Sequence, residues 1–167
     1  MFQAEHFRRF KRMKPQVSQQ AKNYLRTRVM TATREQLQMM LFDGAVRFAQ
    51  QARIALENKD YESSYTNLTR TQHIVLELNR ALKHKEDPEL CGKLASLYNY
   101  TYKQLVLANL KRDIVPLDDA LKILIHQRET WAMLMDQLAK QKAGEAAAKI
   151  DMPEPSAKME AMISVRG

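Results

Sequence analysis

Four long amphipathic segments, separated by breaks of only a few residues, dominate this sequence. They begin at Thr33, Asp60, Asp87 and Asp113, and in each one apolar residues recur with the spacing of one α-helical face. Helices of this length with short connections fold back antiparallel on their neighbours. The sequence therefore predicts an all-α fold, an antiparallel up-down four-helix bundle.

Each segment starts with a residue that can cap a helix. Thr33 is followed three residues later by Gln36, the pattern of a capping box. Asp87 precedes a proline, which favours the first helical position. The chain has only 4 glycines and 5 prolines. Because β-barrels need many turn residues and phosphate-binding loops need glycine, both fold types are poor fits.

The net charge of +8 is concentrated near the N-terminus. Residues 1–33 hold eight Lys and Arg against one Glu, so the rest of the chain is close to neutral. We expect residues 1–21 to form a basic, mobile N-terminal arm. Such an arm suits a helical nucleic-acid-binding protein, an alternative function that would depend on phosphate contacts, but it also suits a membrane surface or a solvated segment.

The sequence predicts neither a secretory signal nor a membrane span. No apolar stretch follows the basic cluster to form a secretory signal, and no run of 18 apolar residues could span a membrane. The lone Cys91 cannot form an internal disulfide, which agrees with a reducing compartment. We expect a cytoplasmic protein without a membrane span.

The helical periodicity ends after Lys142, where alanines and then two prolines follow. We expect residues 22–142 to form the four-helix domain and residues 143–167 a flexible C-terminal tail. Within residues 15–32, apolar residues such as Tyr24 and Val29 stand among polar ones. This N-terminal segment is expected to pack on the bundle.

The sequence carries no recognisable catalytic or metal-binding pattern. The four histidines lie on different segments, and none is spaced to share a metal ion with another histidine or with Cys91. The paired acids Asp118 and Asp119 stand at a helix start, where they favour the helix dipole. We expect no enzyme activity, no cofactor, no metal and no small-molecule substrate.

Apolar surface is what the sequence has in excess. Beside a predicted core stripe that contains Leu37, Met40, Leu41, Ala45 and Phe48, the first segment has a second stripe of Met39, Phe42 and Val46. The third segment carries Tyr98, Tyr100, Tyr102, Val106, Leu107 and Leu110 around most of its circumference. These positions either fill the edges of a wide bundle or form grooves that accept another helix. Because two helices show the same excess of apolar residues, we favour the interpretation that they form grooves.

Four stretches in order resemble the FliS family of flagellin-specific secretion chaperones. They are YLRTRVMTAT at 24–33, LQMMLFDGAVRF at 37–48, LYNYTYKQLVLANLKRD at 97–113 and RETW at 128–131. The resemblance covers about residues 22–139. Arg34 stands where the family commonly has proline, and Phe42 where tyrosine is common; neither difference disturbs the family mechanism.

The resemblance implies a cytoplasmic bundle that binds the C-terminal segment of flagellin, prevents its early polymerisation and helps deliver it to the flagellar type III export apparatus. Other flagellar regulators are possible further partners. It also implies that the N-terminal segment, with Tyr24 at the family's tyrosine position, can cover part of the groove. The residues expected to form or cover that groove are Tyr24, Val29, Met39, Met40, Phe42, Asp43, Val46, Tyr100, Tyr102, Val106, Asn109 and Leu110.

Overall fold

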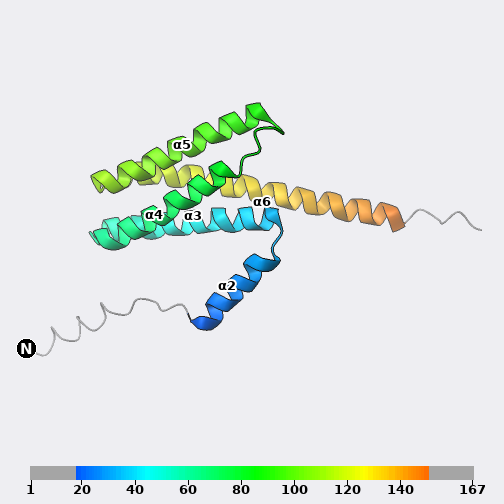
Figure 1. Ribbon diagram of the computed structural model, residues 1–167, viewed down its shortest axis with the longest axis horizontal. Helices are drawn as coiled ribbons and strands as arrows, with labels where there is room; N and C mark the ends of the chain where they lie inside the picture. The colour runs from blue at the N-terminus through cyan, green and yellow to red at the C-terminus, as the bar shows by residue number, and fades with distance from the viewer. Residues whose placement is uncertain (1–17, 151–167) are drawn as a thin grey trace, which may run out of the picture. The chain divides into compact units, whose positions relative to one another are not determined.

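The computed structural model describes residues 18–150, and these residues form helices joined by short connections (Figure 1). The helices are α2 (Gln19–Thr31), α3 (Arg34–Glu57), α4 (Tyr61–Arg80), α5 (Pro88–Lys111) and α6 (Ile114–Ile150). No strand occurs among the described residues, so the predicted all-α class is confirmed there. Within the same range, no helix is both long and apolar enough to cross a membrane.

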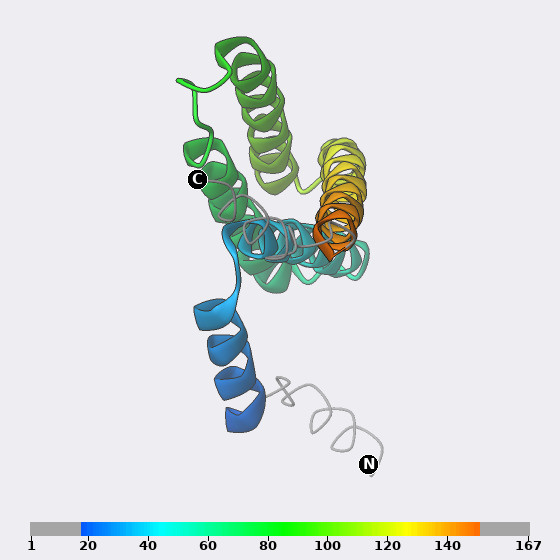
Figure 2. The same ribbon diagram turned by 90° about the vertical axis from the view of Figure 1, so that its right-hand side faces the viewer.

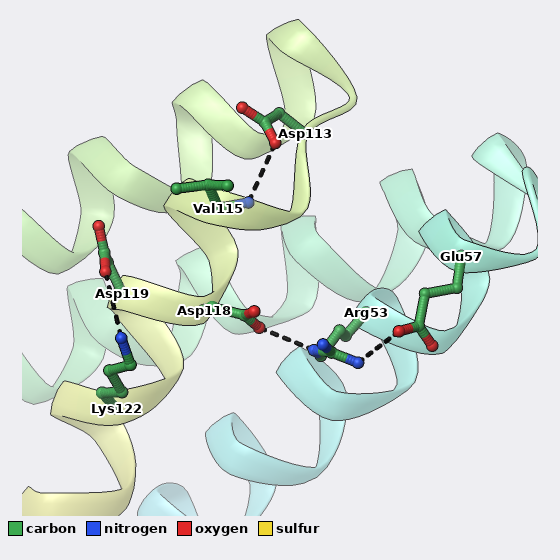
Figure 3. A network of polar contacts seen from close by, with 7 residues as sticks. All are labelled: Arg53, Glu57, Asp113, Val115, Asp118, Asp119 and Lys122. Atoms are coloured by element: carbon green, nitrogen blue, oxygen red, sulfur yellow. Dashed lines mark hydrogen bonds and ion pairs between the residues drawn. The ribbon is translucent and has the colours of Figure 1, made fainter.

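The predicted helix starts are confirmed by their capping contacts. The Thr33 hydroxyl accepts a hydrogen bond from the Gln36 amide at 3.2 Å, and the Gln36 side chain accepts one from the Thr33 amide at 3.0 Å. Asp87 accepts from the Leu90 amide at 2.9 Å. Asp60 and Asp113 cap α4 and α6 in the same manner, the latter through the amide of Val115 (Figure 3).

Two helix ends differ from their predicted positions. Helix α4 ends at Arg80, whereas the basic residues 83–85, which suit the C-terminal end of a helix dipole, predict an end near His84. Helix α6 continues to Ile150, through residues 143–150 that the loss of periodicity had placed in the tail. These residues are rich in alanine, the strongest helix former, and propensity extends the helix where no apolar stripe marks it. Residues 18–21 of the predicted mobile arm instead form the start of α2, with Ser18 as its N-cap. Residues 1–17 of that arm and 151–167 of the predicted tail lie outside the described residues.

The chain divides into two units, Met1–Gln38 and Met39–Gly167. In the second unit, the chain runs alternately in opposite directions through α3, α4, α5 and α6, as the colours in Figure 1 show; Figure 2 gives the view turned by 90°. All four helices contribute to one apolar core, to which α3 supplies mainly alanines and the other helices mainly larger side chains. Its members are Phe42, Ala45, Ala49, Ala52, Leu56, Leu68, Val75, Leu78, Tyr98, Leu105, Ala108, Leu117, Ala120 and Leu124.

The buried face of α3 matches the predicted core stripe only in part: Ala45 of that stripe is 0% exposed, as predicted, but other positions differ. Phe42, assigned from the sequence to the groove-forming stripe, is 3% exposed and belongs to the core. Its ring lies 6.3 Å from that of Trp131 in α6, centroid to centroid. Met40 and Phe48, assigned to the core, are only half-buried. The row of alanines C-terminal to Phe42 explains the difference, because small side chains let neighbouring helices approach that face closely.

Two ion pairs join α3 to α6. Arg53 donates to Asp118 at 2.7 Å, and Arg128 donates to Asp43 at 2.6 Å (the first pair is drawn in Figure 3). Asp43 and Arg53 are ten residues apart on α3, and Asp118 and Arg128 are ten residues apart on α6. Each helix therefore supplies one acidic and one basic residue. The hydrogen bond to Asp118 and the charges of Asp118 and Glu57 raise the pKa of Arg53. A helix register shifted by one turn would lose both pairs.

Charge exchange at the Asp43–Arg128 pair tests whether these ion pairs help to fix the register of α3 against α6. Asp43→Arg places two cations together and is expected to lower the free energy of unfolding by about 0.2–1 kcal/mol, the usual range for an exposed pair. Combining it with Arg128→Asp restores an opposite-charge pair and should recover most of that loss. Urea denaturation of both variants measures the effect, and a double variant no more stable than the single one would contradict it.

Burial of Tyr98 predicts a loss of stability at alkaline pH. Removal from water raises the pKa of the Tyr98 phenol from its ordinary value of 10.0 to about 12. In the unfolded chain this phenol loses its proton at lower pH than in the folded chain, so stability falls as the pH rises from about 10 to about 12. In Tyr98→Phe this contribution is absent. Urea denaturation across this range should show a shallower decline for the variant, whereas equal declines would contradict the prediction.

Candidate functional site

An open groove lies between α4 and α5 in the second unit. It has a volume of about 640 Å³ and runs beside the N-terminal turns of α4 and the C-terminal turns of α5. The residues that line it are Leu56, Tyr61, Glu62, Ser64, Tyr65, Gln72, Val106, Asn109, Leu110 and Arg112.

The walls of this groove, here called the α4–α5 groove, are mainly apolar. Tyr61 and Tyr65 stand four residues apart on α4, and Val106 and Leu110 stand four residues apart on α5, so each pair lies on one helix face. All four are exposed, and Leu110 is 78% exposed. Side chains of this kind at such exposure present a surface that a partner can cover.

Charge in the groove is confined to one end. Arg112 follows α5 in the left-handed conformation, with φ of 53°, and its amide donates to the carbonyl of Ala108, which closes the helix. Its guanidinium lies 4.4 Å from the centre of the Tyr61 ring. This cation–π contact fixes the ring at the groove edge. Glu62 contributes the only acidic side chain among the lining residues.

A buried hydroxyl lies among the lining residues. Ser64 is 2% exposed, and its Oγ is shielded from solvent without a hydrogen-bond partner. The backbone of Ser64 is satisfied, since its amide donates to the carbonyl of Asp60 at 3.0 Å. The groove therefore combines apolar walls with one unsatisfied hydroxyl.

Three of the twelve residues predicted from the sequence come together in this groove. They are Val106, Asn109 and Leu110, all on α5. Tyr100 is exposed on the same helix but does not line the groove, and Tyr102 packs against the core.

The predicted residues on α3 and α2 lie elsewhere. Met39, Met40 and Val46 are half-buried, and Val46 packs against the core. Asp43 is held in its ion pair with Arg128. The placement of Phe42 in the core removes it from any exposed groove. Tyr24 and Val29 are exposed on α2, in the N-terminal unit.

Sequence reasoning missed the α4 side of the groove. Tyr61 and Ser64 fall on the helical period with Leu68, which predicts a core position for both, and Ser64 is indeed buried. Tyr61 is instead 40% exposed, since it stands in the first turn of α4, near the end of the core. Tyr65 was the available signal: a large aromatic residue outside that stripe, four residues after another tyrosine.

Comparison with known proteins identifies relatives of this chain. Residues 17–138 match the family model described as Flagellar protein FliS. A Bacillus subtilis (strain 168) protein named Flagellar secretion chaperone FliS is 33% identical over 121 residues, which cover 72% of this chain and 90% of the relative. The Salmonella typhimurium protein of the same name is 31% identical over 107 residues, covering 64% of this chain and 79% of the relative.

Proposed function

Because the chain belongs to the FliS family of flagellar secretion chaperones, we propose that it binds the C-terminal segment of flagellin in the cytoplasm. Binding prevents premature polymerisation of flagellin and assists its delivery to the type III export apparatus for filament assembly. The role is one of non-catalytic binding by an antiparallel four-helix bundle.

The observation that carries this proposal is the exposed apolar α4–α5 groove. Tyr61, Tyr65, Val106 and Leu110 offer two facing rows of side chains at helical spacing. An amphipathic helix can place its apolar face between such rows. A groove with these walls therefore suits an amphipathic segment of flagellin better than a small polar ligand.

The energetics favour a long, wrapping partner. A segment that is disordered before binding must be ordered by the chaperone, which opposes association. Burial of apolar surface at about 25 cal/mol per Å² offsets that ordering. We propose that the segment extends from the α4–α5 groove over further surface of the second unit. The accessible candidates there are Met39, Met40, Asp43, Val46, Tyr100 and Tyr102.

The exposed face of α2 supports a covering role for the N-terminal segment. Tyr24, Leu25, Val29 and Met30 are all exposed on α2. An apolar face of this kind can occupy a groove meant for another amphipathic helix. We propose that Tyr24 and Val29 cover part of the flagellin-binding surface when flagellin is absent.

A calorimetric titration tests the proposed function. The full chain is titrated with the C-terminal segment of the cognate flagellin, and a matched segment with the same residues in scrambled order serves as the control. We expect saturable binding at micromolar concentrations or below for the native segment only. Absence of binding at micromolar concentrations would overturn the proposal.

A further inference from the structure

The Ser64 hydroxyl differs from the buried threonine hydroxyls among the described residues. The hydroxyl of Thr71 donates to the carbonyl of Asn67 at 3.0 Å, and that of Thr101 donates to the carbonyl of Leu97 at 2.8 Å. Both are satisfied within their own helix. Ser64 Oγ has no such partner and is shielded from solvent. A buried polar atom without a hydrogen bond destabilises the free protein, and a partner that supplies the missing hydrogen bond removes this destabilisation.

Its position determines which partner can reach it. Ser64 lines the α4–α5 groove together with Tyr61 and Tyr65 of the same helix, and Val106 and Leu110 line the groove from α5. In the described residues, the other buried side-chain atoms without a partner belong to Gln127, which does not line this groove. Because Ser64 is 2% exposed, a partner reaches Oγ only with a side chain inserted deep into the groove, toward which the hydroxyl can turn by rotation about one bond.

We propose that Ser64 is a specificity-determining residue of the groove. Its hydroxyl forms a hydrogen bond with a Ser, Thr, Asn or Gln side chain on the amphipathic helix of flagellin that occupies the groove. The inference rests on the proposed function and names the pattern that the groove selects: apolar residues against the two walls and one hydrogen-bonding side chain facing Ser64. A wholly apolar helix leaves the hydroxyl unsatisfied and binds less tightly.

The test compares Ser64→Ala with the wild-type chain in two measurements. In a calorimetric titration with the flagellin C-terminal segment, the variant is expected to bind about twofold to tenfold more weakly, the range for one neutral hydrogen bond. In thermal unfolding without flagellin, its melting temperature is expected to be unchanged or higher, because the hydroxyl that it loses had no partner.

Thr71→Val is the matched control. It removes a buried hydroxyl from the same helix at nearly constant volume, but that hydroxyl is bonded to Asn67 and lies outside the groove lining. It should lower the melting temperature and leave flagellin affinity unchanged. The two variants are therefore expected to show opposite patterns of stability and affinity.

Alanine replacement of each polar residue in the flagellin segment completes the test. One replacement should weaken binding to the wild type and have no further effect on Ser64→Ala. If the wild type binds flagellin and Ser64→Ala binds equally well, or if that variant melts at lower temperature, the role of Ser64 is overturned and the proposed function stands. If the wild type does not bind flagellin, both are overturned.

Discussion

Replacement of Phe42 by alanine is expected to lower the free energy of unfolding by about 3–5 kcal/mol, the usual loss for a buried aromatic side chain. The side chain is 3% exposed and packs against Trp131, so its removal leaves a cavity between α3 and α6. Alanine is a strong helix former, and the loss therefore reports on packing and not on helix propensity. Urea denaturation followed by circular dichroism measures the change.

Tyr65→Ala is the control for this prediction. It also removes an aromatic ring from a helix, but Tyr65 is 60% exposed. Its effect on stability should be within about 1 kcal/mol. A Phe42→Ala variant that keeps wild-type stability and loses flagellin binding would instead place Phe42 in the groove, as the periodicity of the sequence suggested.

Replacement of Leu110 by glutamate is expected to weaken flagellin binding by about tenfold to a hundredfold. Leu110 is the most exposed apolar side chain on the groove wall, and a partner that covers it would have to bury the new carboxylate. Stability of the free protein should change little, because the side chain already faces solvent. Calorimetric titration gives the affinity, and urea denaturation of the same variant gives the stability.

Leu90→Glu provides the matched control. Leu90 is exposed on the same helix, twenty residues earlier and therefore about 30 Å away along the axis. Glutamate is favourable near a helix N-terminus, so this variant should keep both stability and affinity. Equal weakening by the two variants would show a general effect of added negative charge and would contradict the assignment of the groove.

Helix starts were the most predictable part of this structure, because they depend on local chemistry. Thr33 with Gln36 and Asp87 with Pro88 define helix starts through contacts that span only a few residues. The end of α6 was less predictable. Its last turns follow helix propensity without an amphipathic stripe, and periodicity alone does not detect a helix of that kind.

The buried face of α3 could be predicted only in part from its sequence. Two apolar stripes lie side by side on that helix, and both satisfy the 3.6-residue period. Tertiary packing decides between them: Trp131 of α6 meets Phe42, and the alanines beyond it permit close approach. Neighbouring residues such as Leu41 and Phe42 point in directions about 100° apart around the helix, so a small rotation of the helix decides which of the two is buried. For this reason the sequence did not place Phe42 in the core.

Only the α5 wall of the groove was predicted from the sequence. Val106 and Leu110 were singled out because α5 carries more apolar residues than one core face can use, Asn109 was singled out by the family resemblance, and all three line the groove. The α4 wall was missed because Tyr61 and Ser64 fall on the core period of that helix, and their exposure or lack of a partner depends on where the neighbouring helix ends. Orphaned polar atoms are a property of three-dimensional packing and have no signature in the sequence.

Methyl NMR of the full chain with the flagellin C-terminal segment tests the central claim most directly, because it locates the bound segment on the α4–α5 groove. The methyl groups of Val106 and Leu110 line the groove, and those of Leu90 lie near the other end of α5. We predict that saturation with flagellin shifts the Val106 and Leu110 resonances and leaves Leu90 unchanged. Saturable binding that leaves Val106 and Leu110 unshifted would contradict the account.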